Sequence, residues 1–159
     1  MASTSVSGIG YVVPIMALAV LMGGAEPVRA EQGASSGSAS LNITVRGIKS
    51  SKGVIRLAIC PPNAGFPDCK GREVRSASLP IQNGEATIRF TDLPAATYAI
   101  SVFHDGNANG KLDTFLGIPK EGYGFSRNPP FRPRAPRFAE VELLVSGAMT
   151  ETIMLRYIL

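Results

Sequence analysis

The stretch "ATIRFTDLPAATYAISVFHD", residues 86–105, contains two runs in which apolar and polar side chains alternate. A period of two places every second side chain on the same face of a β-strand. The apolar residues that recur in this way are Ala86, Ile88 and Phe90 in the first run and Tyr98, Ile100 and Val102 in the second. Leu93 and Pro94 are a turn signal between the runs. The stretch therefore predicts two strands joined by a short turn.

The same period recurs in segments on both sides of this stretch. These segments are "LNITVR" (41–46), "VIRLAIC" (54–60), "AEVELLV" (139–145) and "ETIMLRYIL" (151–159). The turn residues that separate the runs include Gly53, Asn83-Gly84, Asn109-Gly110 and Gly147. Short strands at this spacing are typical of an all-β, immunoglobulin-like antiparallel sandwich, here with about seven strands.

The first 30 residues predict an export signal. Ile9 to Ala25 is almost continuously apolar, and Val28-Arg29-Ala30 is a small-x-small cleavage site. A membrane anchor is the alternative, but the run is shorter than the roughly 20 residues that a spanning helix needs. We expect a signal peptide at 1–30, a flexible leader at 31–40 and one sandwich domain at 41–159, without a membrane span after cleavage. The mature protein would be periplasmic or extracellular.

Two cysteines occur in the chain, in "CPPNAGFPDC", residues 60–69. Disulfides form in oxidising compartments, and the proline- and glycine-rich segment can bend back on itself. We expect Cys60 and Cys69 to form a disulfide, with two free thiols as the alternative.

Four arginines lie among prolines in "RNPPFRPRAPR", residues 127–137, in a chain of formal net charge +4. Proline favours an extended segment that holds charged groups apart in water. Arg127, Arg132, Arg134 and Arg137 therefore form either a solvated linker or an edge that binds the anionic groups of a glycan or lipid surface. So modest a charge on an exported protein argues against nucleic acid as a partner.

The segment "DGNANGKLD", residues 105–113, resembles the first half of an EF-hand-type calcium loop. The candidate ligands are the side chains of Asp105, Asn107, Asn109 and Asp113 and the carbonyl of Lys111. Calcium takes about 6–8 oxygen ligands, so Glu121 or water would complete the shell, and binding would be weak. The alternative is a turn in which these residues bond only to their own backbone. No other cofactor is expected.

His104 is the one histidine of the chain. It continues the face of Tyr98, while Asp105 should point to the opposite face of the same strand. One interpretation is a histidine at the end of the core that bonds to a loop backbone. The other is a base that works with the carboxylates of Asp105, Asp113 and Glu121.

Glycines and aromatics combine in "GIPKEGYGF", residues 117–125. Glycine admits close backbone approach, and aromatic rings can cover the end of a sheet or hold a ligand. Tyr123 and Phe125 are therefore either packing residues or the platform of a ligand-binding lip.

With "HDGNANGKLDTFLGIPKEGYGFS", residues 104–126, and "APRFAEVELLV", residues 135–145, the chain resembles the bacterial exported family known as domain of unknown function 2141. The 86–105 module is also similar to transthyretin-like and carboxypeptidase-regulatory-like sandwiches. The resemblance implies the fold and export but no activity. Gly106 departs from the pattern, since family members often carry a glutamate there.

Two functions follow as expectations. The first is a non-enzymatic binding or structural module of the cell envelope, whose partner is an envelope or extracellular protein or an anionic glycan or lipid surface. The second is a small periplasmic enzyme that uses His104 and the loop carboxylates.

Overall fold

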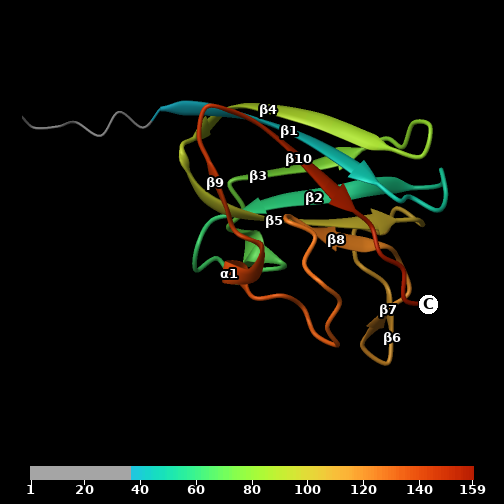
Figure 1. Ribbon diagram of the computed structural model, residues 1–159. Coiled ribbons are helices and arrows are strands. Elements are labelled where there is room, and N and C mark those ends of the chain that lie inside the picture. The colour runs from blue at the N-terminus through green and yellow to red at the C-terminus, as the bar shows by residue number, and fades with distance from the viewer. Residues whose placement is uncertain (1–36) are drawn as a thin grey trace, which may run out of the picture. The chain divides into compact units, whose positions relative to one another are not determined.

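The computed structural model describes residues 37–159, so the predicted signal peptide and residues 31–36 of the leader lie outside the described residues (Figure 1). The strands are β1 (Ser38–Arg46), β2 (Val54–Cys60), β3 (Arg75–Leu79), β4 (Ala86–Pro94), β5 (Ala96–Asp105), β6 (Thr114–Phe115), β7 (Ile118–Pro119), β8 (Tyr123–Phe125), β9 (Leu143–Val145) and β10 (Ala148–Met154). The helices are the 3₁₀ turn η1 (Cys69–Gly71) and the single-turn α1 (Phe138–Val141). The prediction of an all-β chain is confirmed.

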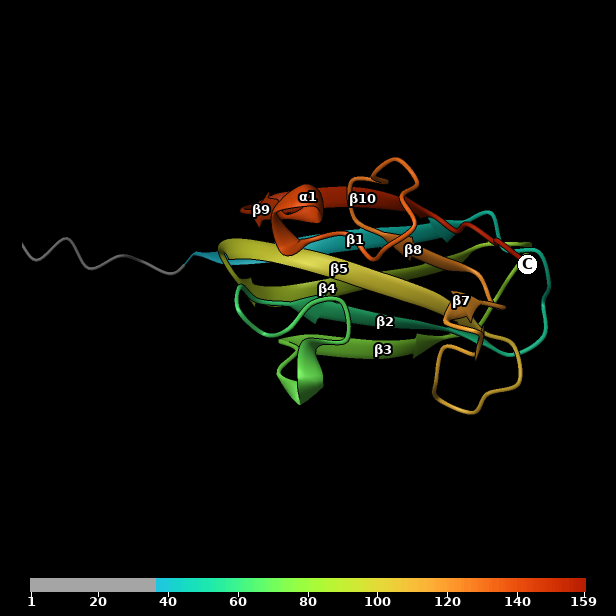
Figure 2. The same ribbon diagram turned by 90° about the horizontal axis from the view of Figure 1, so that it is seen from below.

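The strands form two larger sheets and one hairpin. The first sheet has the order β10-β1-β4, and the second has the order β3-β2-β5-β8, with β9 also paired to β5. Figure 1 shows them in two layers, and the view from below in Figure 2 shows β5 running along the second layer. Both sheets contribute to one core, which includes Leu41, Ile43, Phe90 and Ile153 from the first and Ile55, Ile59, Ile100 and Val102 from the second.

The 86–105 stretch forms β4 and β5, as expected. Tyr98 is buried, and its hydroxyl donates a hydrogen bond of 2.9 Å to the carbonyl of Pro94. Burial raises the pKa of Tyr98. This bond spans the bend at Ala95, which separates β4 from β5, and it fixes the direction in which β5 begins.

Three details of the sequence prediction are wrong. β1 begins at Ser38, three residues before the predicted start of the sandwich domain at residue 41. Residues 138–141 form α1 in place of a strand, because the carboxylate of Glu140 accepts the N–H of Arg137 and starts a helical turn. β1 and β10 are parallel, although an antiparallel sandwich is predicted. β9 runs antiparallel to β5, and the chain then reverses near Gly147, so that β10 begins beside the start of β1.

Cys60 and Cys69 lie at disulfide distance, with Cα atoms 5.6 Å apart. Both are buried, with Cys60 at the end of β2 and Cys69 in η1, within the loop between β2 and β3. The carbonyl of Pro67 in this loop accepts a 2.8 Å hydrogen bond from the hydroxyl of Ser101 on β5. The loop is therefore attached to the second sheet at two points.

Within residues 37–159, we find no helix with the length and apolar character needed to cross a bilayer.

Candidate binding site

Asp105 ends β5 and has a fully buried side chain. Its carboxylate accepts hydrogen bonds from the guanidinium of Arg56 at 3.0 Å and from the N–H groups of Gly110 at 2.8 Å and Asn109 at 2.9 Å. Burial opposes ionisation, but the bonds to Gly110, Arg56 and Asn109 outweigh it and lower the pKa of Asp105. Asp105 thus holds the following loop to β2 as a buried anion.

The remaining candidate calcium ligands are brought together by the loop but bond to one another. The carboxylate of Glu121 accepts the N–H groups of Gly106 and Asp113, each at 2.9 Å. The carboxylate of Asp113 accepts the side-chain amides of Asn107 at 2.8 Å and Asn109 at 3.0 Å. In the described part of the chain, no group of three His, Cys, Asp or Glu side chains is placed to hold a metal. Calcium binding stays a prediction.

His104 points into the core side of β5 and is 5% exposed. One ring nitrogen, Nε2, lies 2.7 Å from the carbonyl of Lys52, so it must carry the proton and donate it. Nδ1 lies 2.8 Å from the hydroxyl of Tyr157, which also accepts the N–H of Lys49. Both nitrogens of His104 are therefore occupied by bonds that tie the loop between β1 and β2 to the C-terminal segment.

The proposed catalytic combination does not assemble. His104 and Asp105 point to opposite faces of β5, as the alternation predicts, and each is already bonded within the protein. The carboxylates of Asp113 and Glu121 accept loop N–H groups.

β8 presents Tyr123 and Phe125 on its outer face because the glycines beside them fit where a side chain would not. A Cβ on Gly122 would collide with the ring of Tyr157, and a Cβ on Gly124 would lie 2.8 Å from Cγ2 of Ile153. The rings of Tyr123 and Phe125 are half-buried, with centroids 5.7 Å apart. The glycines of the motif thus set an aromatic pair on the surface of the second sheet.

The arginine-rich segment 127–137 is folded back against this pair. Ser126 is buried, and its hydroxyl donates to the carbonyl of Val141 at 2.6 Å and accepts the N–H of Ile100 at 3.0 Å. The far end of the segment is fixed at α1, where the carboxylate of Glu140 accepts two 2.8 Å bonds from Arg134. The segment is therefore an attached loop, and it does not behave as a free linker.

The loop, β8 and the β6–β7 hairpin enclose a groove of about 400 Å³, which we call the aromatic–arginine groove. Its lining includes Tyr123, Phe125, Phe131, Ile118, Ile158, Arg132 and Arg134. Among the described residues that line it, the two arginines are the charged ones. Two separate sequence predictions, the aromatic lip and the anion-binding edge, therefore meet in one cavity.

A second cavity of about 360 Å³ continues the groove past Arg127 and Arg156. The guanidinium of Arg156 lies 5.9 Å from the ring centroid of Phe131. Hydrogen bonds from Arg134 and from the N–H of Arg137 lower the pKa of Glu140 to about 2, so this carboxylate stays charged and occupies part of the Arg134 fork. Arg137 lines neither of these two cavities, and its role in anion binding stays a prediction.

The sequence analysis missed Phe131, Arg156 and Ile158 as groove residues. Phe131 is the aromatic residue within the arginine- and proline-rich segment, which is a signal that could have been used. Arg156 and Ile158 were assigned to a C-terminal strand, but β10 ends at Met154 and the chain then crosses toward the groove.

A family model described as "Uncharacterized protein conserved in bacteria (DUF2141)" matches residues 43–153. The chain belongs to this family. The match covers both larger sheets except for the first part of β1 and the last residue of β10, and it includes the loop after β5, the glycine–aromatic segment and the arginine-rich loop. Comparison with curated proteins and with solved structures gave no match.

Proposed function

We propose that this DUF2141 chain is an immunoglobulin-like sandwich that is exported by residues 1–30 and serves as a non-enzymatic binding module of the bacterial cell envelope. Its binding face is the aromatic–arginine groove, and its partner is anionic. The observation that carries the proposal is the meeting of Tyr123, Phe125 and Phe131 with Arg132 and Arg134 in one cavity.

The chemistry of the groove supports an anionic partner with an apolar part. Arginine presents a planar fork of N–H donors that suits carboxylate, sulfate or phosphate groups. Aromatic rings offer a flat apolar surface beside those donors. Among the described residues that line the groove, none carries a carboxylate. Glu140 lines the neighbouring cavity and contacts the two arginines from there.

The bonding of the polar loop favours a binding module over an enzyme. A general base needs a partner and access to a substrate proton. His104 is almost fully buried, and its two nitrogens face Lys52 and Tyr157. These bonds support a role for His104 in positioning the C-terminal segment.

The proposal is tested with dextran sulfate, a soluble polyanion, and the double variant Arg132→Gln with Arg134→Gln. We expect the wild type to bind at low ionic strength, binding to weaken with added salt, and the variant to lose at least tenfold in affinity. Arg72→Gln with Arg89→Gln removes the same charge from exposed positions outside the groove and should bind within about twofold of the wild type. Equal losses in both variants would show that only net charge matters and would contradict a groove site.

We also propose weak calcium binding at the loop of residues 105–113. The side-chain amide nitrogens of Asn107 and Asn109 bond to the carboxylate of Asp113. Rotation of both amide groups would bring their oxygens next to this carboxylate, as a set of oxygen ligands for the ion. Millimolar Ca²⁺ should then raise the melting temperature of chelator-treated protein, and Asp113→Ala should abolish the rise. An unchanged melting curve would leave the loop as a turn that needs no ion.

A further inference from the structure

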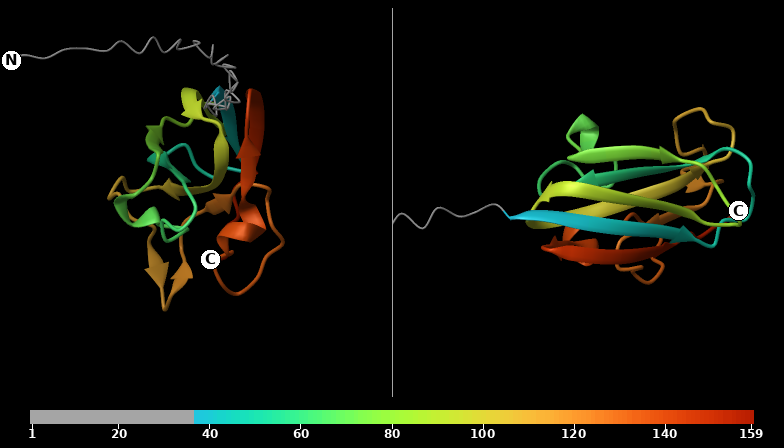
Figure 3. Two further views of the ribbon diagram at one scale, coloured as in Figure 1. Left: turned by 90° about the vertical axis from the view of Figure 1, so that its left-hand side faces the viewer. Right: turned by 90° about the horizontal axis from the view of Figure 1, so that it is seen from above.

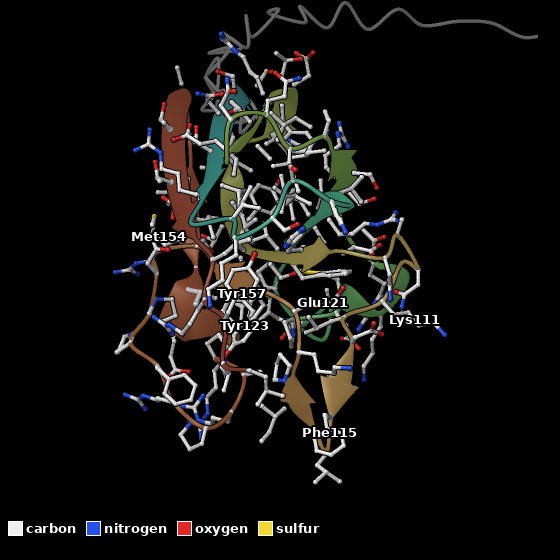
Figure 4. The ribbon with its side chains drawn as sticks, turned by 90° about the vertical axis from the view of Figure 1, so that its right-hand side faces the viewer. Lys111, Phe115, Glu121, Tyr123, Met154 and Tyr157 are labelled. Atoms are coloured by element: carbon white, nitrogen blue, oxygen red, sulfur yellow. A yellow bond between two sulfur atoms is a disulfide. The ribbon has the colours of Figure 1, made fainter. Side chains whose placement is uncertain are left out.

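The β6–β7 hairpin exposes large apolar side chains at its turn. Leu116 is 87% exposed, Phe115 is 61% exposed and Ile118 is 42% exposed. Figure 3 shows the hairpin extending away from both sheets, and Figure 4 shows Phe115 at its far end, pointing outward. These side chains therefore lie in water in the isolated protein, and Leu116 is the most exposed of the large apolar residues in the described part of the chain.

The backbone of the turn makes a leucine at position 116 unexpected. Phe115 pairs with Ile118, so Leu116 and Gly117 form a two-residue turn, with φ angles of +49° and +79°. A hairpin turn with two positive φ angles favours Asn-Gly, and a leucine is unfavourable at the first position. Neither backbone preference nor burial accounts for Leu116, so its side chain is better explained by contact with a partner.

Arg132 and Arg134 lie beside the hairpin and pair with Glu140, and Asp113 and Glu121 flank the hairpin in the sequence. Ile118 and Pro119 line the aromatic–arginine groove together with Arg132 and Arg134, and the exposed Ile158 lies in the same lining. An apolar tip beside cationic side chains matches the boundary between lipid headgroups and acyl chains on an anionic leaflet. In a dimer formed through this surface, the arginines of the two copies would face each other, and their like charges would repel.

We propose that the hairpin is the tip by which the protein docks on an anionic lipid surface. Phe115 and Leu116 enter the headgroup–acyl boundary, while Arg132 and Arg134 contact lipid phosphates. This inference rests on the proposed function and identifies its anionic partner as a bilayer surface.

The chain has no tryptophan, so Phe115→Trp provides a single fluorescent reporter at the tip. With the exported protein and vesicles of phosphatidylethanolamine and phosphatidylglycerol, we expect its emission to shift to shorter wavelengths and to be quenched by brominated lipids. Leu144→Trp is the matched control, because Leu144 is 65% exposed on β9, away from the hairpin (Figure 1). It should show neither change.

Leu116→Asn tests the tip while preserving the turn, since it creates the Asn-Gly pair that this turn favours. We expect vesicle affinity to fall at least tenfold and binding of dextran sulfate to stay unchanged. An unshifted Phe115→Trp emission in a protein that still binds dextran sulfate would overturn the inference and leave the proposed function standing. A shift without vesicles that grows with protein concentration would also overturn it, in favour of self-association. A wild-type protein that binds neither the vesicles nor dextran sulfate would overturn the proposed function as well.

Discussion

At the scale of the residue, Asp105 connects the fold to the loop that precedes the groove. Its carboxylate receives one bond from a side chain of β2 and two from the backbone of its own loop. A buried carboxylate with three donors is stable only as an anion, and its loss would leave Arg56 and two N–H groups without their acceptor. Asp105 is therefore expected to contribute to the stability of the fold and not to catalysis.

The variant Asp105→Asn should lower the free energy of unfolding by about 1.5–3 kcal/mol at pH 7, the range for hydrogen bonds to charged groups. Because the folded-state pKa of Asp105 is lowered, the stabilisation is complete above the unfolded pKa of about 3.9 and is lost as the pH falls below it. Urea denaturation at pH 7 and pH 3 measures both effects, and the difference between wild type and variant should shrink at pH 3.

Asp68→Asn is the control for this variant, since Asp68 is exposed. It should change the stability by less than about 0.5 kcal/mol, the usual range for surface substitutions. A wild type and Asp105→Asn of equal stability at pH 7 would contradict the bonding described for the loop.

At the scale of the element, β8 is a strand of three residues that depends on its glycines. Gly124 lies against β10, where a Cβ would be 2.8 Å from Ile153 and 2.9 Å from the carbonyl of Met154. The strand is therefore pressed between β5 and β10, and this close approach turns Tyr123 and Phe125 outward.

Gly124→Ala should destabilise the protein by about 1–3 kcal/mol, as expected for overpacking in a filled core. Gly106→Ala is the matched control, because its Cβ would lie 3.7 Å from the nearest atom, on Glu121, and its φ is not positive. Thermal melting of both variants measures the difference. A Gly124→Ala protein as stable as Gly106→Ala would show that β8 can move away from β10.

The elements that sequence could predict are those with a clear period of two. β4 alternates more and less buried side chains from Ala86 to Phe90, and β5 does so from Ile100 to His104. β3, "RSASL", carries only Ala77 and Leu79 on its inner side and gives no such signal. The aromatic pair and the arginines were found separately. They lie in one groove because hydrogen bonds of Ser126 and Glu140 hold the arginine-rich segment against β8. The partners in these bonds are separated along the chain, so no local sequence pattern predicts them.

At the scale of the whole molecule, one core holds the two sheets, and the loops packed around β8 carry the candidate function. The loop that carries Cys60 and Cys69 contributes to this site, since Pro67 lines the aromatic–arginine groove and the ring of Phe66 lies 5.6 Å from that of Phe125, tilted by 59°. The disulfide is therefore expected to stabilise both the fold and the wall of the groove.

Replacing Cys60 and Cys69 with serine should lower the stability by about 2–3 kcal/mol, the chain-entropy estimate for a short bridged loop. Chemical denaturation measures the loss, and reduction of the wild type with dithiothreitol should produce the same change. Dextran sulfate affinity should also fall, since the wall of the groove loosens. A reduced protein with unchanged stability would contradict a structural role for the bridge.

The most direct test of the central claim is the nuclear magnetic resonance spectrum of ¹⁵N-labelled protein titrated with dextran sulfate at low ionic strength. We predict that the largest amide shifts fall on Tyr123 to Phe125 and on the arginine-rich segment 127–137, with little change at Asp105 and Asn107. Shifts centred on His104 and the 105–113 loop, or an unchanged spectrum, would contradict an anion-binding module whose site is the aromatic–arginine groove.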